Sequence, residues 1–146
     1  MHTFYVSSFG KNSNKGIYIV HFDKNSDELS IVQHIVTKDY PSYMVIKDNN
    51  LYITYKNANR SSDGGGLGSF AIYKDELIIN NNFASNGRSY THLCISDNSR
   101  YLFAANYQVG STASYLLENG HIKEKIGAIH HLSLIHISEP TRLQLI

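Results

Sequence analysis

The chain has 146 residues, of which 42% are hydrophobic and 17% charged, and its formal net charge is +1. This balance is typical of one globular domain, and it argues against a disordered chain or a basic surface that attracts nucleic acid. The 11 tyrosines, the absence of tryptophan and the short runs of Val, Ile, Tyr and Phe between polar residues favour strands over helices.

Turn-forming residues separate eleven short apolar runs along the chain. The sequence therefore predicts an all-β protein with strands, in chain order, at residues 4–7, 17–22, 29–36, 43–46, 51–55, 67–73, 76–83, 93–95, 101–105, 110–117 and 121–129.

The runs at 93–95 and 101–105 form the clearest β-hairpin, because a four-residue turn, SDNS, joins them. Antiparallel strands place the entry of the first and the exit of the second at the same end. We therefore expect His92, Asn106 and Tyr107 to lie together on one rim.

The hairpin belongs to a repeat. Residues 42–49 (SYMVIKDN) can be laid over residues 91–98 (THLCISDN) without a gap, which puts Tyr43 on His92. The period is roughly 44 to 50 residues, as in propeller blades. Because the first unit begins with its second strand, we predict a partial β-propeller of about two and a half to three four-stranded antiparallel blades. Its open blade edges would promote self-association.

The end of the chain does not follow the repeat. Residues 132–142 (LSLIHISEPTR) resemble the translation of a sequencing adapter, so we predict a propeller domain over 1–131 and a non-native tail over 132–146. The alternative is a divergent C-terminal strand and turn. Sequencing genomic DNA past the codon for His131 tests this, because continuation of the present tail would contradict the adapter origin.

The sequence predicts a cytoplasmic protein without membrane contact. No signal-like segment opens the chain, and no apolar run could span a bilayer.

Cys94 is the only cysteine and lies in an apolar run, which favours a buried, inert thiol over a reactive one.

Several stretches resemble the lactonase family of seven-bladed β-propellers, which includes propeller-type 6-phosphogluconolactonases and carboxymuconate-cyclising enzymes. The likeness is carried by residues 5–8 (YVSS), 15–18 (KGIY), 41–43 (PSY), 64–66 (GGG) before 69–72 (SFAI), and 91–93 (THL) before 100–107 (RYLFAANY). Tyr90 replaces the proline that usually precedes the Thr-His pair.

This resemblance implies a site at the central opening. It makes His92 the catalytic candidate, as a general base or hydrogen-bond donor, with Tyr43, Arg88, Asn106 and Tyr107 as substrate-binding candidates. Each also has a structural interpretation, because a histidine at a strand end often packs against the next blade and an Asn-Tyr pair can cap a turn. His130 and His131 point to opposite faces of a strand, so no metal is expected. The resemblance implies no cofactor.

The implied function belongs to the whole propeller. It is hydrolysis of a sugar lactone such as 6-phosphogluconolactone, in carbohydrate metabolism and the pentose phosphate pathway, with the 146-residue chain itself inactive. The alternatives are a non-catalytic propeller that binds a protein or small ligand, and a lactonising cyclase of the carboxymuconate type. Clustered Arg, His and Glu in the remaining blades would favour an enzyme.

Overall fold

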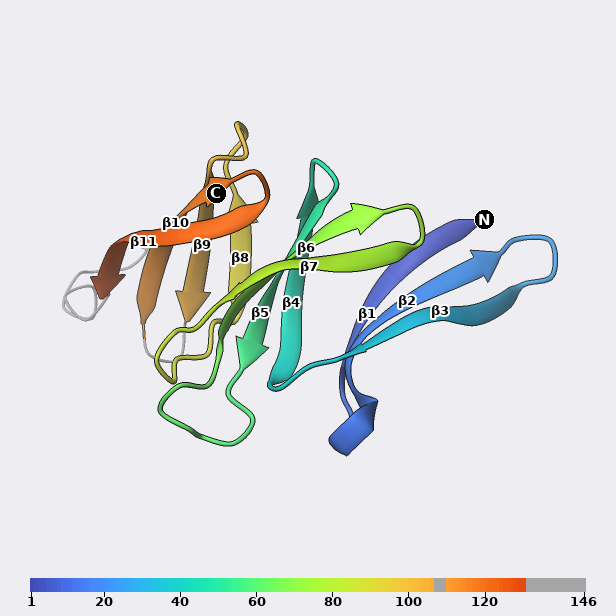
Figure 1. Cartoon of the computed structure of the whole chain (residues 1–146), viewed down its shortest axis with the longest axis horizontal. Helices are drawn as coiled ribbons and strands as arrows, with labels where there is room; N and C mark the ends of the chain where they lie inside the picture. Colours follow the sequence, from blue (N-terminus) through green and yellow to red (C-terminus); the bar gives the residue numbers. More distant parts are fainter. Residues whose placement is uncertain (107–109, 131–146) are drawn as a thin grey trace, which may run out of the picture.

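The computed structural model of the chain describes residues 1–106 and 110–130, which form three twisted antiparallel sheets (Figure 1). A short 3-10 helix, η1 (Asn12–Asn14), joins the first two strands. The strands are β1 (His2–Phe9), β2 (Lys15–Asp23), β3 (Glu28–Val36), β4 (Tyr40–Lys47), β5 (Asn50–Lys56), β6 (Gly66–Tyr73), β7 (Glu76–Phe83), β8 (His92–Ile95), β9 (Tyr101–Asn106), β10 (Ser111–Glu118) and β11 (His121–His130).

The sheets confirm the predicted blades. The first has the order β1-β2-β3, and the others have the orders β4-β5-β6-β7 and β8-β9-β10-β11. Each of the eleven predicted strands overlaps a strand in the described part of the chain, and most of the observed strands are one to three residues longer than predicted. The first blade lacks an innermost strand, as the repeat predicts. The predicted tail, residues 132–146, lies outside the described residues, and its boundary stays a prediction.

Two hairpin turns each contain two consecutive residues with a left-handed backbone conformation. Asp48 and Asn49, between β4 and β5, have φ of 52° and 60°, and Asn119 and Gly120, between β10 and β11, have φ of 52° and 80°. Two consecutive positive φ angles are typical of type I′ turns, whose twist matches that of the flanking strands.

The apolar core lies between the blades. One cluster joins Ile17 and Ile19 of the first blade to Leu51, Ile53 and Phe70 of the second. A second cluster joins the second blade to the third; it includes Tyr52, Leu67, Leu93, Leu102 and Tyr115. Because β5 contributes to both, five consecutive residues of this strand are buried and it shows no alternation of polar and apolar residues.

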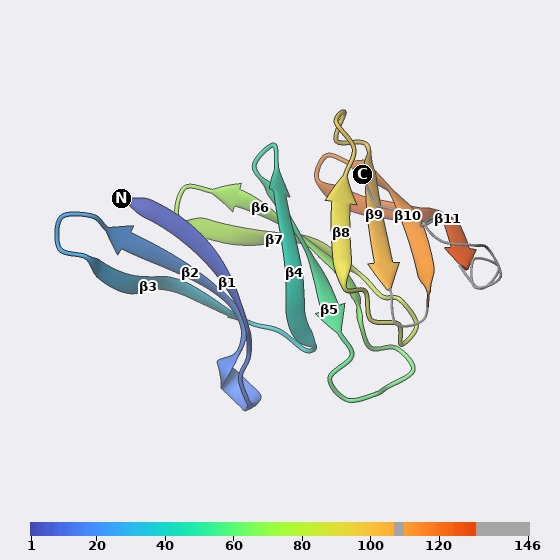
Figure 2. The same cartoon turned by 180° about the vertical axis from the view of Figure 1, so that it is seen from behind.

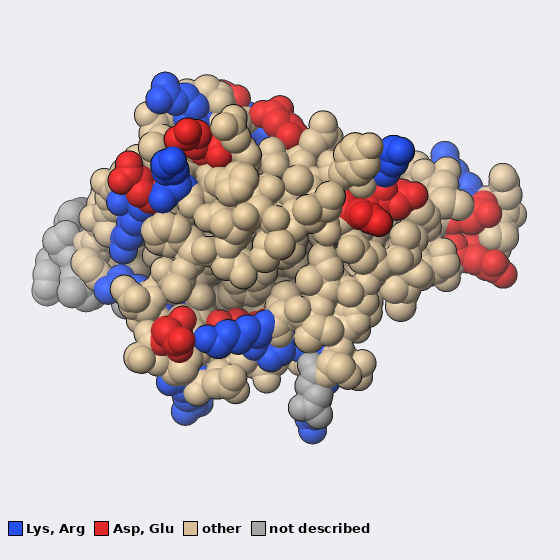
Figure 3. All heavy atoms as spheres, in the orientation of Figure 1, with Lys and Arg blue, Asp and Glu red and all other residues tan. Residues whose placement is uncertain are grey.

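The innermost strands of the second and third blades, β4 and β8, lie side by side. β4 also contacts β1, and Figure 2 shows β1, β4 and β8 in that order. Tyr5 packs against the first cluster, so its neighbours Phe4 and Val6 point to the open face of the first blade and are 48% and 45% exposed. On the face in Figure 3, acidic and basic side chains are interspersed around the edges. None of the described residues belongs to a helix long and apolar enough to cross a membrane.

Candidate functional site

The structure brings His92 and Tyr43 together on neighbouring innermost strands. Their ring centroids are 4.5 Å apart and the ring planes are inclined by 31°. His92 is half-buried and Tyr43 is 37% exposed, so the pair is open to solvent on one side. The His92 imidazole makes no hydrogen bond with another described residue, which leaves both ring nitrogens able to contact water or a ligand.

Tyr43 is held by an irregularity in its strand. The register between β4 and β5 shifts between Pro41 and Met44, and at this shift the Tyr43 N–H donates to the Oγ1 of fully buried Thr54 at 3.0 Å. Ser7 of the first blade donates to the Ser42 carbonyl at 3.0 Å. The second blade and the first therefore both position the backbone that carries the Tyr43 ring.

His92 is positioned by its hairpin. It pairs with Ala105 across β8 and β9, and the Thr91 N–H and hydroxyl both donate to the Ala105 carbonyl, at 2.8 and 3.1 Å. Asn106 directly follows Ala105, so the structure places His92 and Asn106 at the same end of the hairpin, as expected. Tyr107 lies outside the described residues, and its role stays a prediction.

Asn106 is a buried polar residue whose side chain has a structural role. Its side chain is 5% exposed and its amide nitrogen donates to the Ser89 carbonyl. The loop at residues 84–91, which leads into β8, is thereby tied to the end of β9. A part in substrate binding stays a prediction.

Arg88 lies in the same loop and its side chain is exposed. Its carbonyl accepts a hydrogen bond from the Ser85 hydroxyl. The buried Tyr115 hydroxyl is 2.8 Å from that of Tyr90. Burial and Tyr90 raise the pKa of Tyr115, and the positive charge of Arg88 opposes that rise. Arg88 therefore lies near the junction of the second and third blades, where an anion could reach it.

Two residues that the sequence did not single out organise this rim. The Asp39 carboxylate is 7% exposed and accepts hydrogen bonds from the N–H groups of Ala58 at 3.0 Å and Gly65 at 2.8 Å. Asn57 donates its own N–H to the Ser89 hydroxyl at 2.9 Å. The loop at residues 57–65 is thus held by Asp39, which precedes β4, and by Ser89, in the loop before β8. A single Asp or Asn before a loop carries no distinguishing sequence signal.

The glycine run at 64–66 ends that loop and begins β6. A Cβ at Gly65 would lie 2.1 Å from the Arg88 carbonyl oxygen, and one at Gly66 would lie 2.3 Å from that of Phe83. Their φ angles are 77° and 114°. Close backbone packing and a left-handed conformation therefore explain these two glycines.

No metal centre emerges at the rim or elsewhere in residues 1–106 and 110–130, where no three His, Cys, Asp or Glu side chains gather as a ligand set.

Known proteins align with most of this chain. The 6-phosphogluconolactonase of Bacillus subtilis strain 168 is 26% identical over 131 residues, which cover 87% of this chain and 37% of that protein. An uncharacterized protein of Staphylococcus aureus strain USA300 is 28% identical over 131 residues, covering 88% and 37%. The chain thus spans about a third of the length of these curated relatives.

Solved structures show the same fold. A candidate 6-phosphogluconolactonase of Bacteroides fragilis superimposes with a TM-score of 0.73 at 22% identity, and a protein of Lactobacillus plantarum with 0.67 at 16%. Each alignment covers 88% of this chain and 36% of the other. A model of the lactonase family, described as a seven-bladed β-propeller, matches residues 3–139. With its repeat and its blades, the chain belongs to the lactonase family of seven-bladed β-propellers.

Proposed function

We propose that the propeller to which these blades belong hydrolyses a sugar lactone, with 6-phosphogluconolactone as the leading substrate. The tilted ring contact between His92 and Tyr43 is the observation that carries this proposal, because it sets an imidazole with unoccupied nitrogens on the innermost strands. The name of the Bacillus subtilis relative supports the substrate class. A cytoplasmic location and a place in the pentose phosphate pathway are parts of the same proposal.

The proposed chemistry needs one proton acceptor at His92. A water oxygen attacks the lactone carbonyl carbon while the imidazole takes a proton from that water. The tetrahedral oxyanion then collapses, the ring C–O bond breaks, and the released alkoxide takes up a proton to give the open hydroxy acid. Tyr43 positions the imidazole through the tilted contact between the two rings, and an aromatic contact of this kind contributes about 0.5–1.5 kcal/mol.

Arg88 is the proposed contact for the substrate's anionic group. Its exposed side chain lies on the loop that Asn106 ties to the end of β9, and a guanidinium suits a phosphate or carboxylate. The blades beyond this chain would supply the remaining groups that stabilise the oxyanion.

The test uses the complete propeller that contains these blades. We expect His92→Asn to lower kcat/KM for 6-phosphogluconolactone about 100-fold or more, the usual effect of losing a general base. His34→Asn is a matched control. The His34 ring also lies against a tyrosine ring, that of Tyr18, with the centroids 3.9 Å apart, but His34 belongs to the outer strand β3. It should leave kcat/KM within a few-fold of wild type.

Retention of activity by a folded His92→Asn variant would overturn the role of His92. A wild-type propeller without turnover on phosphorylated or neutral sugar lactones would instead favour the non-catalytic alternative, while ring closure of a carboxymuconate would favour the cyclase.

A further inference from the structure

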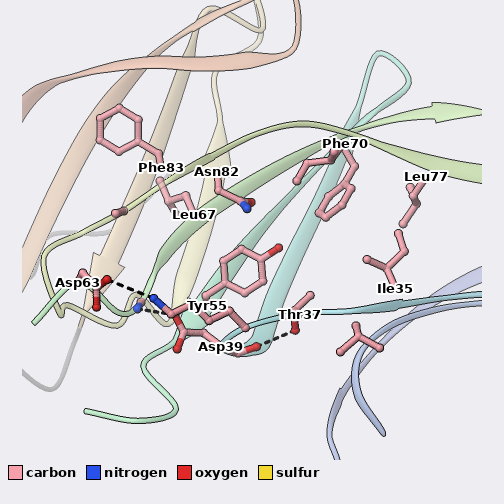
Figure 4. Close-up of a pocket in the computed structure, with 15 residues that line it drawn as sticks. Ile35, Thr37, Asp39, Tyr55, Asp63, Leu67, Phe70, Leu77, Asn82 and Phe83 are labelled. Atoms are coloured by element: carbon pink, nitrogen blue, oxygen red, sulfur yellow. Dashed lines mark hydrogen bonds and ion pairs between the residues drawn. The ribbon is translucent and has the colours of Figure 1, made fainter. Parts of the chain in front are cut away.

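A cavity lies between the first and second blades, and neither His92 nor Tyr43 is among the residues that line it. Its volume is about 440 Å³, within the range of roughly 300–1,000 Å³ that is usual for small-molecule sites. The walls come from β3, β5, β6, β7 and the loops of the rim (Figure 4). Its apolar lining includes Ile35, Tyr55, Leu67, Phe70, Leu77 and Phe83.

The Tyr55 hydroxyl is the unusual group in this cavity. The side chain is only 7% exposed, yet among the described residues its hydroxyl has no hydrogen-bond partner. Figure 4 shows the ring in the middle of the lining residues, with its oxygen turned away from Asp39 and toward the side where Phe70 lies. Because this hydroxyl borders the cavity and no described residue bonds to it, it can make a hydrogen bond with a ligand or a water there.

Two further observations fit a ligand at Tyr55. A Cβ at Gly68 would lie 2.8 Å from the Tyr55 hydroxyl oxygen, so a residue without a side chain is needed there to leave room for the ring. Burial and the nearby Asp39 carboxylate raise the pKa of Tyr55. The phenol therefore keeps its proton at neutral pH and can donate it in a hydrogen bond.

The charges at the cavity disfavour an anion. Asp39 is satisfied by backbone N–H groups, and Lys38 pairs with Asp63 at 3.3 Å. The Ser61 hydroxyl and Lys38 lower the pKa of Asp63, so this carboxylate is ionised at neutral pH. With two carboxylates and one ammonium among the lining residues, the local charge is negative, which opposes a phosphate or a carboxylate.

We propose that this cavity binds an uncharged small molecule that has an apolar, ring-sized body and one hydrogen-bond acceptor for the Tyr55 hydroxyl. The site differs from the proposed lactone site in position and in charge preference. Every residue that lines it belongs to the first two blades, so it does not depend on blades beyond this chain.

Acetophenone is a suitable probe, because it joins an aromatic ring to an uncharged carbonyl acceptor. Saturation-transfer NMR on the 146-residue chain needs only micromolar protein, which limits association through open blade faces. We expect binding by the wild-type chain and about 5–10-fold weaker binding by Tyr55→Phe, the loss that follows from one hydrogen bond of about 1–1.4 kcal/mol.

Two controls distinguish this hydrogen bond from nonspecific hydrophobic binding. Tyr52→Phe is matched, because Tyr52 is also buried on the same strand, at 3% exposure against 7% for Tyr55, but packs in the second cluster. This variant should bind acetophenone like wild type. Ethylbenzene lacks an acceptor and should bind wild type and Tyr55→Phe equally. Absence of acetophenone binding, equal acetophenone affinity in Tyr55→Phe and wild type, or benzoate binding as tight as that of acetophenone would each overturn the proposal.

Discussion

Single polar residues decide how the rim is held together. The Asp39 carboxylate accepts two backbone N–H groups from the loop at residues 57–65, and the Asn106 amide holds the loop before β8. Because these side chains replace backbone partners that an irregular loop lacks, they set the shape on which the candidate site depends.

Asp39→Ala should lower the free energy of unfolding by about 1–3 kcal/mol, because it leaves the partly buried N–H groups of Ala58 and Gly65 without acceptors. Urea denaturation of the chain measures this loss. Asp63→Ala is the control, since this neighbouring carboxylate is exposed and its side-chain partners are Lys38 and Ser61. Its loss should matter much less. Equal effects of the two substitutions would contradict the special role of Asp39.

At the scale of elements, the outermost strands are joined by a repeated amide contact. The Gln33 side chain accepts from the Leu77 N–H at 2.9 Å and donates to its carbonyl at 3.4 Å. Asn81 makes the same pair of bonds with Ile122, at 3.0 and 2.8 Å. Both amides directly follow a register shift in their strands, and Gly127 holds the corresponding place in the third blade.

Asn81→Leu should therefore destabilise the chain by about 1–3 kcal/mol, because the backbone groups of buried Ile122 lose both partners. Gln33→Leu should cost less, since one of its bonds is longer. Urea midpoints of the two variants test this order. An unchanged midpoint in Asn81→Leu would refute the contribution.

At the scale of the whole molecule, the chain exposes faces that a closed ring would cover. Phe4 and Val6 lie on the open face of the first blade, and Ile126 and Ile129 of β11 are 48% and 58% exposed. Exposed apolar side chains beside unpaired strand edges favour association.

We expect the isolated 146-residue chain to self-associate and to lack lactonase activity, because it spans only about a third of the length of its curated relatives. Sedimentation velocity at increasing concentration measures the first property, and hydrolysis of 6-phosphogluconolactone measures the second. Folding of the sample is checked by its β-type circular dichroism. A monomer with turnover comparable to a complete propeller enzyme would contradict the expectation.

The sequence predicted the strands, the missing innermost strand and the alignment of Tyr43 with His92. These features depend on local patterns, namely alternating apolar residues, turn-forming residues and a regular period. The alignment of two positions in a repeat says only that they occupy equivalent places; it does not say that their rings touch. The contact between the two rings, whose centroids are 4.5 Å apart, appears only in the structure.

The interactions that shape the rim and the cavity could not be predicted in this way. Asp39 reaches Gly65 across 26 residues and Gln33 reaches Leu77 across 44, and neither pair has a local pattern. Tyr55 looks like any apolar strand residue, and only the packing of two blades leaves its hydroxyl facing a cavity. The sequence alone thus determined the strands and the blade repeat, because these depend on neighbouring residues. The tertiary structure decided which side chains meet, because blade packing joins residues far apart in the chain.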